Sequence, residues 1–242
     1  MSSELAIALV RPGLLGTYGD RGNATVLCER LRRRGIASRV LDLDRGAVPR
    51  DADIYLLGGG EDGAQSSVAA DPQVRDALHA AVDRNAVVFA VCAGFQLLGE
   101  SFETGGGDVV AGFGLLDCRS ARRDAPRAVG EILCRPRVEL ELPPLTGFEN
   151  HGGGTWLGAD LVPLAQVEAG IGNGDGSGGE GAIEGRTVGT YLHGPVLARN
   201  PALADLLLEW ALGAPLAPLA MPEVERLRAE RLAEVGPERA RA

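Results

Sequence analysis

One stretch in the middle of the chain, Val87–Gly99, constrains the fold more than any other. It opens with an apolar run of β-branched and aromatic residues, which is typical of a buried strand. The run stops at Cys92, two small residues follow, and apolar side chains resume from Phe95 at helical spacing. The stretch therefore predicts a strand, a sharp turn and a helix, with a thiol at the end of the strand.

A cysteine at such a turn can be chemically active. The helix that begins after it offers unpaired backbone N–H groups and the positive end of its dipole, and both lower a thiol pKa. Ala93 and Gly94 leave room for a substrate carbonyl, and the N–H of the residue after a nucleophile is expected to lie in an oxyanion hole. Cys92 is therefore a candidate nucleophile. A buried cysteine that acts only as a small apolar residue is the alternative.

The charged residues exclude several classes of function. The chain has a formal net charge of −9, and all 24 of its basic residues are arginine. A chain with this excess of acidic residues is not expected to form a basic surface that binds nucleic acid, and it has no lysine for a phosphate-binding loop. If the reaction uses ATP, we expect another chain to hold it.

The cysteines and the apolar runs favour a cytoplasmic protein. No Cys-x-x-Cys pair is present, so neither a zinc ribbon nor a thioredoxin-like motif is predicted, and the thiols are expected to be reduced. The N-terminus has no basic segment followed by an apolar core, and no run reaches roughly 18 apolar residues, the length that spans a bilayer. We expect no metal site, no membrane insertion and a cytoplasmic location.

The first half of the chain alternates strand and helix patterns. Strands are predicted at 5–10, 38–43, 53–57 and 87–91, and helices from Asn23, a candidate cap, to Gly35 and over 72–85. Because strands and helices alternate, we expect an α/β fold with a mostly parallel central sheet flanked by helices.

The second half of the chain is rich in β patterns. Strands are predicted at 109–118, 128–134, 138–142 and 161–168, and the polar segment 170–181 is predicted to be a flexible surface loop. A helix over 201–212, with Asn200 as a candidate cap, follows. We therefore expect one domain over residues 1–213 and a charged helical extension over residues 214–242, which is solvated or faces a partner.

A second chemical signal is His193, which a predicted strand beginning at Thr187 delivers to its end. Functional groups collect at strand ends in α/β sheets. The other histidines are weaker candidates, because His79 lies in a predicted helix and His151 lies in a glycine-rich loop, where a structural role is favoured over ligand contact. A cysteine and a histidine are the minimum for covalent acyl transfer, in which the imidazole deprotonates the thiol and later protonates the leaving amine.

A third signal is the glycine-rich segment Gly58–Gln65, at the end of another predicted strand. Its consecutive glycines let the backbone approach a ligand closely and point N–H groups at it. The segment matches neither a P-loop nor the Gly-x-Gly-x-x-Gly fingerprint, and a plain flexible turn is the alternative.

Together these motifs resemble those of class I (triad) glutamine amidotransferases, and within them the cobyric-acid-synthase-like branch and its GatD-type members. Beside the nucleophile stretch, the resemblance rests on four segments in order: Thr17–Asn23, Gly58–Gln65, Phe148–Gly153 and His193–Pro201. It extends from about residue 5 to residue 212. GatD-type proteins are the glutaminase subunits of lipid II isoglutaminyl synthase, an enzyme of peptidoglycan synthesis.

The resemblance implies a mechanism. Cys92 would attack the side-chain amide of L-glutamine, release ammonia and leave a γ-glutamyl thioester that water hydrolyses. His193 would carry the protons. The backbone N–H groups of Gly59 or Gly60 and of Ala93 would stabilise the oxyanion.

The resemblance also implies which side chains bind glutamine. Gln65 and Gln96 belong to the motifs that line the glutamine pocket of the family. Arg127 is the best match to the arginine that binds the substrate carboxylate, and Arg123 is a weaker match; a guanidinium pairs bidentately with a carboxylate.

Two positions depart from the family pattern. Many class I members carry an acid two residues after the histidine, where this chain has Pro195, so another group must hold the imidazole tautomer. The resemblance implies an aspartate of the partner ligase in this role, and a carboxylate of this chain is the alternative. Relatives often have arginine where this chain has Gly154.

The partner implied is a Mur-ligase-like, MurT-type subunit that forms a heterodimer with this chain and holds ATP and magnesium. That subunit would use the ammonia to amidate the stem-peptide glutamate of lipid II to isoglutamine. Alternatives with another acceptor are a cobyrinate-type amidotransferase subunit and a γ-glutamyl hydrolase. A non-catalytic scaffold is the remaining alternative.

Overall fold

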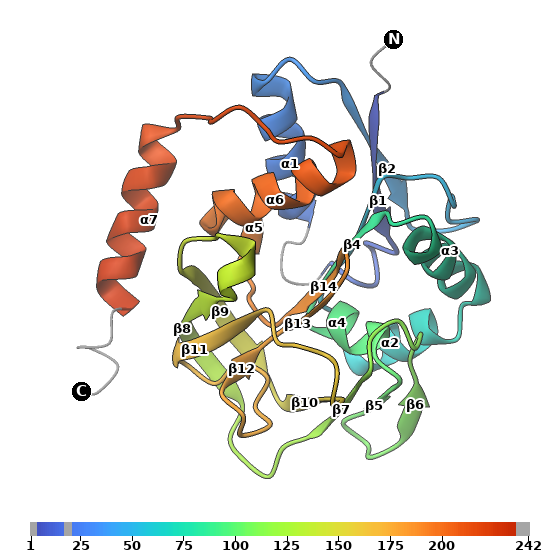
Figure 1. Cartoon of the computed structure of the whole chain (residues 1–242). Coiled ribbons are helices and arrows are strands. Elements are labelled where there is room, and N and C mark those ends of the chain that lie inside the picture. The colour runs from blue at the N-terminus through green and yellow to red at the C-terminus, as the bar shows by residue number, and fades with distance from the viewer. Residues whose placement is uncertain (1–3, 17–20, 236–242) are drawn as a thin grey trace.

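A computed structural model describes residues 4–16 and 21–235. The first four residues of the Thr17–Asn23 motif and the last part of the predicted tail, 236–242, lie outside the described residues. Figure 1 shows a twisted central sheet with helices on both sides and a β-rich region below it.

The central sheet has six strands in the order β13-β14-β4-β3-β1-β2. Its neighbouring strands are parallel except for β13, which is antiparallel to β14. The strands are β1 (Leu5–Val10), β2 (Ser38–Leu43), β3 (Ile54–Leu57), β4 (Val87–Val91), β13 (Ala182–Glu184) and β14 (Thr187–Thr190). The predicted α/β fold with a mostly parallel sheet is confirmed. Every residue of β1, β3 and β4 is buried, which explains why their sequences are continuous apolar runs.

Seven α-helices accompany the sheet in the described part of the chain. They are α1 (Arg21–Arg33), α2 (Asp62–Ala69), α3 (Pro72–Asp83), α4 (Ala93–Leu98), α5 (Val196–Arg199), α6 (Pro201–Leu212) and α7 (Pro222–Val235). In Figure 1, α1, α5 and α6 lie on one side of the sheet and α2, α3 and α4 on the other.

The prediction that Asn23 caps the first helix is wrong. Asn23 lies inside α1, where its buried Oδ1 accepts the backbone N–H of Leu197 at 3.1 Å and ties α1 to α5.

The β-rich second half forms two further four-stranded sheets, in the orders β10-β7-β5-β6 and β12-β11-β8-β9. Their strands are β5 (Ser101–Glu103), β6 (Val109–Ala111), β7 (Cys118–Arg122), β8 (Ala128–Pro136), β9 (Leu145–His151), β10 (Gly153–Leu157), β11 (Ala165–Ala169) and β12 (Gly179–Glu180). Only the two ends of the predicted strand 109–118 are extended. The predicted strand at 138–142 is wrong: a short 3-10 helix, Val138–Leu140, occupies it, and Val138 is 82% exposed.

The polar segment 170–181 is ordered by buried side chains, which corrects the prediction of a flexible surface loop. The carboxylate of Glu149 accepts the backbone N–H of Ile171 at 2.9 Å and of Gly172 at 2.6 Å. Asn173 is fully buried, and its side-chain amide bonds both the N–H and the carbonyl of Gly181 at 2.8 and 2.9 Å. These bonds satisfy backbone groups that a mobile loop would leave to water.

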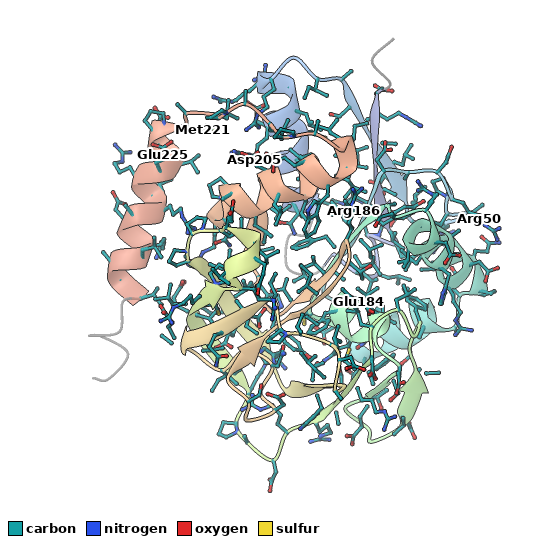
Figure 2. The ribbon with its side chains drawn as sticks, viewed as in Figure 1. Arg50, Glu184, Arg186, Asp205, Met221 and Glu225 are labelled. Atoms are coloured by element: carbon teal, nitrogen blue, oxygen red, sulfur yellow. The ribbon has the colours of Figure 1, made fainter. Side chains whose placement is uncertain are left out.

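The C-terminal segment crosses from α6 to α7, which stands against the β8 side of the molecule (Figure 1). Figure 2 shows Asp205 on α6, where its carboxylate pairs with Arg30 of α1 and with Arg34, the residue that follows α1. Arg228 of α7 donates to the carbonyl of Arg199 at 2.6 Å, so the extension contacts the domain. The division into residues 1–213 and 214–242 stays a prediction.

Within residues 4–16 and 21–235, none of the helices combines the length and the apolar character that crossing a bilayer requires.

Candidate active site

The predicted nucleophile and base lie at the same edge of the central sheet. Strands β4 and β14 are parallel neighbours, with Val91 opposite Thr190. Cys92 directly follows β4, and its N–H donates to the carbonyl of Thr190 at 2.9 Å. His193 lies three residues beyond the end of β14. Because parallel strands end at one edge, the topology brings together two residues that are far apart in the sequence.

The turn at Cys92 is a strained strand-to-helix turn. Its φ and ψ are 54° and −111°, a region that non-glycine residues seldom occupy. Gly94 makes the turn tight: its N–H donates to the carbonyl of Gly58 at 3.1 Å, and a Cβ there would lie 2.8 Å from that of Leu57. The predicted strand, turn and helix are therefore confirmed.

The backbone of Ala93 and that of Gly60 lie at the same edge of the central sheet as Cys92. Ala93 is the first residue of α4, so its N–H has no acceptor within the helix. Gly60 follows β3 and packs so closely that a Cβ would lie 2.7 Å from the carbonyl oxygen of Leu14. Both residues line the cavity into which Cys92 opens.

His193 is buried and is held as one tautomer. Its Nδ1 lies 2.9 Å from the carbonyl oxygen of Phe148, which can only accept, so Nδ1 carries the proton of the neutral ring. The two residues also exchange backbone hydrogen bonds at 3.0 and 3.2 Å. Burial lowers the pKa of His193 below its usual value, which leaves a neutral imidazole with Nε2 as the basic nitrogen at neutral pH.

A cavity of about 610 Å³ opens beside Cys92. Its described wall contains most of the predicted site residues: Gly60, Gln65, Cys92, Ala93, Gln96, Arg123 and Arg127. The wall does not include Gly59 or His193; His193 is buried three residues beyond the end of β14.

The wall of this cavity carries charges of both signs. Its wall includes Arg122, Arg123 and Arg127 together with Glu61, Asp62 and Glu103. Arg127 is oriented by Asn150, which accepts at 2.7 Å through its side chain and at 2.9 Å through its carbonyl. A cavity with both signs suits a zwitterionic amino acid, whose ammonium and carboxylate need opposite partners.

The two predicted glutamines form part of a buried hydrogen-bond chain. Gln65 donates to Oε1 of Gln96 at 2.9 Å, and Gln96 donates to the hydroxyl of Tyr191 at 3.0 Å. That hydroxyl lies 2.7 Å from the hydroxyl of Thr155, which contacts Ser120 at 2.7 Å. Because each member has a partner, the amide groups at the cavity wall are held in fixed orientations.

Several residues near the site were missed by sequence reasoning, chiefly Tyr191, Glu149 and Glu180. The ring of His151 stacks on Tyr191 with centroids 4.0 Å apart, and Nε2 of His151 lies 3.8 Å from Glu149. His151 is thus a cavity-wall residue with the structural contacts that the sequence favoured. The buried Glu180 gave no sequence signal, because it follows a run of glycines that reads as an exposed loop.

Burial raises the pKa of Glu180 to about 7, which makes the protein sensitive to pH. Between the ordinary carboxyl value and about 7, the folded state binds a proton that the unfolded chain has lost. We therefore expect the free energy of unfolding to fall by about 3 kcal/mol as the pH rises through this window.

Urea denaturation of the wild type and of Glu180→Gln across this pH range tests the expectation. The amide cannot ionise, so its stability curve should lack this decline. Parallel curves for the two proteins would show that Glu180 does not titrate in the folded state.

The fold and the site together define a class I glutamine amidotransferase, with a thiol at a strand-to-helix turn and a histidine just beyond the end of the neighbouring strand. The sequence profile of the CobB/CobQ-like glutamine amidotransferase domain matches residues 6–201, and the chain belongs to this family. Its activity is therefore that of a glutamine amidotransferase.

Within the family the chain is similar to GatD proteins, which confirms the predicted resemblance. It is 34% identical over 212 residues to the lipid II isoglutaminyl synthase (glutamine-hydrolyzing) subunit GatD of Streptococcus pneumoniae, covering 86% of this chain and 81% of that protein. For the Staphylococcus aureus GatD the identity is 32% over 211 residues, covering 86% and 84%.

Solved structures share the fold at low sequence identity. A crystal structure of a glutamine amidotransferase has a TM-score of 0.59 at 18% identity and covers 85% of this chain and 98% of that one. The structure of PurLQS from Thermotoga maritima has a TM-score of 0.58 at 14% identity, with coverage of 87% and 99%. These likenesses confirm the predicted class I fold.

Proposed function

We propose that this chain is the glutaminase subunit of a lipid II isoglutaminyl synthase. The observation that carries the catalytic part is the arrangement at the sheet edge, where Cys92 directly follows β4 and a neutral, buried His193 lies three residues beyond the end of the parallel neighbouring strand β14. The names of its relatives, GatD subunits of that enzyme, support the assignment to lipid II amidation.

In the proposed first step, Nε2 of His193 takes the proton of the Cys92 thiol and the sulfur attacks the carboxamide carbon of L-glutamine. The N–H groups of Ala93 and of Gly59 or Gly60 stabilise the oxyanion. The carbon–nitrogen bond then breaks, and His193 returns the proton to the leaving nitrogen, which departs as ammonia.

In the second step, water attacks the γ-glutamyl thioester. His193 takes a proton from the water and returns it to the sulfur as the carbon–sulfur bond breaks, which releases glutamate and the free thiol. The Phe148 carbonyl, 2.9 Å from Nδ1, keeps the proton of the neutral ring on Nδ1, so Nε2 is the nitrogen that takes and returns the proton in both steps. This carbonyl supplies an acceptor for Nδ1 without the partner aspartate that the resemblance implies.

The proposed partner is a Mur-ligase-like, MurT-type subunit in a heterodimer with this chain. It would bind ATP and magnesium, activate the stem-peptide glutamate of lipid II and receive the ammonia to form isoglutamine. A glutaminase assay of the full chain, alone and with its co-purified ligase subunit, tests both the hydrolysis of glutamine and the use of its ammonia by the partner. Ammonia release without ATP-dependent amidation of lipid II by the pair would overturn the assignment of the acceptor.

Arg127 is proposed to bind the glutamine carboxylate at the cavity wall. We expect Arg127→Ala to raise KM for glutamine about 10- to 100-fold with little change in kcat, because one bidentate ionic contact is lost in ground and transition states alike.

Arg123→Ala is the matched comparison, since Arg123 also lines the cavity. We expect its KM to change less than that of Arg127→Ala. Steady-state ammonia release over a range of glutamine concentrations gives both values, and a larger KM effect at Arg123 would exchange the two assignments.

A further inference from the structure

Beyond β14 the chain leaves the ladder of the central sheet before it reaches His193. Two backbone N–H groups on this path, those of Tyr191 and Leu192, are bonded by side chains. Tyr191 donates to Oε1 of Glu180 at 3.0 Å, and Leu192 donates to the hydroxyl of Thr190 at 3.1 Å. The Thr190 hydroxyl itself donates to the same oxygen of Glu180. One carboxyl oxygen therefore accepts from both Thr190 and Tyr191 in the link between the strand and the histidine.

The same link also contacts the nucleophile. The carbonyl of Thr190 accepts the N–H of Cys92 at 2.9 Å. The side chain of Tyr191, whose N–H Glu180 accepts, holds Gln96 at the cavity wall. A shift of Thr190 and Tyr191 would thus move Cys92, Gln96 and His193 relative to one another.

Glu180 is itself fixed by the segment that the sequence suggested was flexible. It is fully buried at the junction where β12 of one sheet passes into β13 of the central sheet. The next residue, Gly181, has a φ of +62°, and a Cβ there would lie 2.4 Å from the carbonyl oxygen of Gly189, so only glycine fits. Asn173 bonds both backbone groups of Gly181. The junction is a rigid support for Glu180.

From these contacts we propose that Glu180 is a positioning residue for catalysis, which sets the placement of His193 against Cys92 by accepting hydrogen bonds from Thr190 and Tyr191. Glu180 does not line the cavity beside Cys92, so it would act through Thr190 and Tyr191 and not by contact with the reacting atoms. The proposal rests on the proposed glutaminase function and assigns this buried carboxyl a role in it.

The positioning role of Glu180 depends on its acceptor oxygen and not on its charge. Its surroundings include Glu149, which disfavours a second negative charge, and His151, which favours one; the thiol of Cys134 is also near. Burial raises the pKa of Glu180 to about 7, so the neutral acid is accessible near neutral pH. A glutamine in its place keeps an acceptor oxygen, whereas a leucine of similar size does not.

The test compares Glu180→Gln and Glu180→Leu in the full chain, alone and with its ligase subunit. We expect Glu180→Leu to lower kcat for glutamine about 100-fold with KM within about twofold, because a small misplacement of reacting groups is costly. Glu180→Gln should stay within about threefold of the wild type in both constants. Glu184→Leu is the matched control, since Glu184 is exposed on the neighbouring strand β13 (Figure 2).

A second readout does not depend on glutamine. Alkylation of Cys92 by iodoacetamide, followed on its own peptide by mass spectrometry, reports how the imidazole activates the thiol. We expect the pH midpoint of this reaction to rise by about one unit in Glu180→Leu and to stay unchanged in Glu180→Gln. Burial raises the pKa of Cys118 to about 12 and that of Cys134 further, so these thiols react slowly.

If Glu180→Leu does not fold, Thr190→Val and Thr190→Ser repeat the comparison, because only serine keeps the hydroxyl. An unchanged kcat and alkylation profile in the folded acceptor-deleting variant would overturn the proposal, as would equal losses in Glu180→Gln and Glu180→Leu. A wild type that releases no ammonia would refute the proposed function instead, and the alkylation profiles would still decide the role of Glu180.

Discussion

Replacing Cys92 by serine is expected to lower kcat for glutamine hydrolysis by about 10⁴-fold or more. A serine hydroxyl is a much weaker nucleophile than a thiolate, and it would occupy the same turn before α4. KM for glutamine should change little, because Arg127 and the amide chain of Gln65 and Gln96 remain. Ammonia release at saturating glutamine measures the effect.

Cys28→Ser is the matched control, since Cys28 lies in α1, outside the cavity that contains Cys92. It should leave both constants unchanged. The covalent intermediate gives an independent check: acid-quenched wild type should carry a γ-glutamyl adduct on the Cys92 peptide that the serine variant lacks. Glutamine hydrolysis by Cys92→Ser within tenfold of the wild type would rule out the thioester route.

The parts of the fold that could be predicted are those whose signal is local. Strands β1 and β2 begin and end where the sequence predicted them, because a strand buried on both faces must be apolar along its whole length, as β1 is, and the edge strand β2 is bounded by turn residues. The turn at Cys92 could be predicted for a similar reason: the apolar run, the two small residues and the new helical spacing are all adjacent.

The parts that could not be predicted depend on contacts between distant segments. Residues 138–142 alternate apolar and acidic side chains, but no strand in the described part of the chain pairs with them, and Val138 remains exposed. Alternation of apolar and polar residues determines which side chains lie on each face of a strand, but it does not supply a neighbouring strand to pair with. Segment 170–181 is polar, and its order comes from Glu149 and Asn173, whose acceptors and donors only the tertiary structure shows.

The site shows the same division. Cys92 and His193 could be found because each ends a strand pattern, whereas Glu180 lies among glycines and has no such pattern. Its importance follows from which backbone groups it bonds. The acceptor for Nδ1 of His193 is likewise a backbone carbonyl, that of Phe148, which no residue type can reveal. No carboxylate lies two residues after His193, and no sequence motif identifies the Phe148 carbonyl as the acceptor.

Replacing His193 by glutamine is expected to lower kcat about 10³- to 10⁴-fold, since the general base for attack and the acid for ammonia departure are lost together. In the wild type, kcat/KM should fall as the pH drops through the pKa of His193. Because burial lowers that pKa, the midpoint of this acid limb should lie below about 6.5, the value of a free imidazole.

The residual activity of His193→Gln should have lost this limb, and that loss distinguishes a proton carrier from a residue that merely fills space. His79→Gln is the matched control: His79 lies in α3, with Nε2 2.8 Å from the carbonyl oxygen of Phe113, and it is not among the described residues that line the cavity. It should keep the wild-type profile. An acid limb that persists unchanged in His193→Gln would assign the proton transfer to another group, and the shared sheet edge of β4 and β14 would then not be the reason for activity.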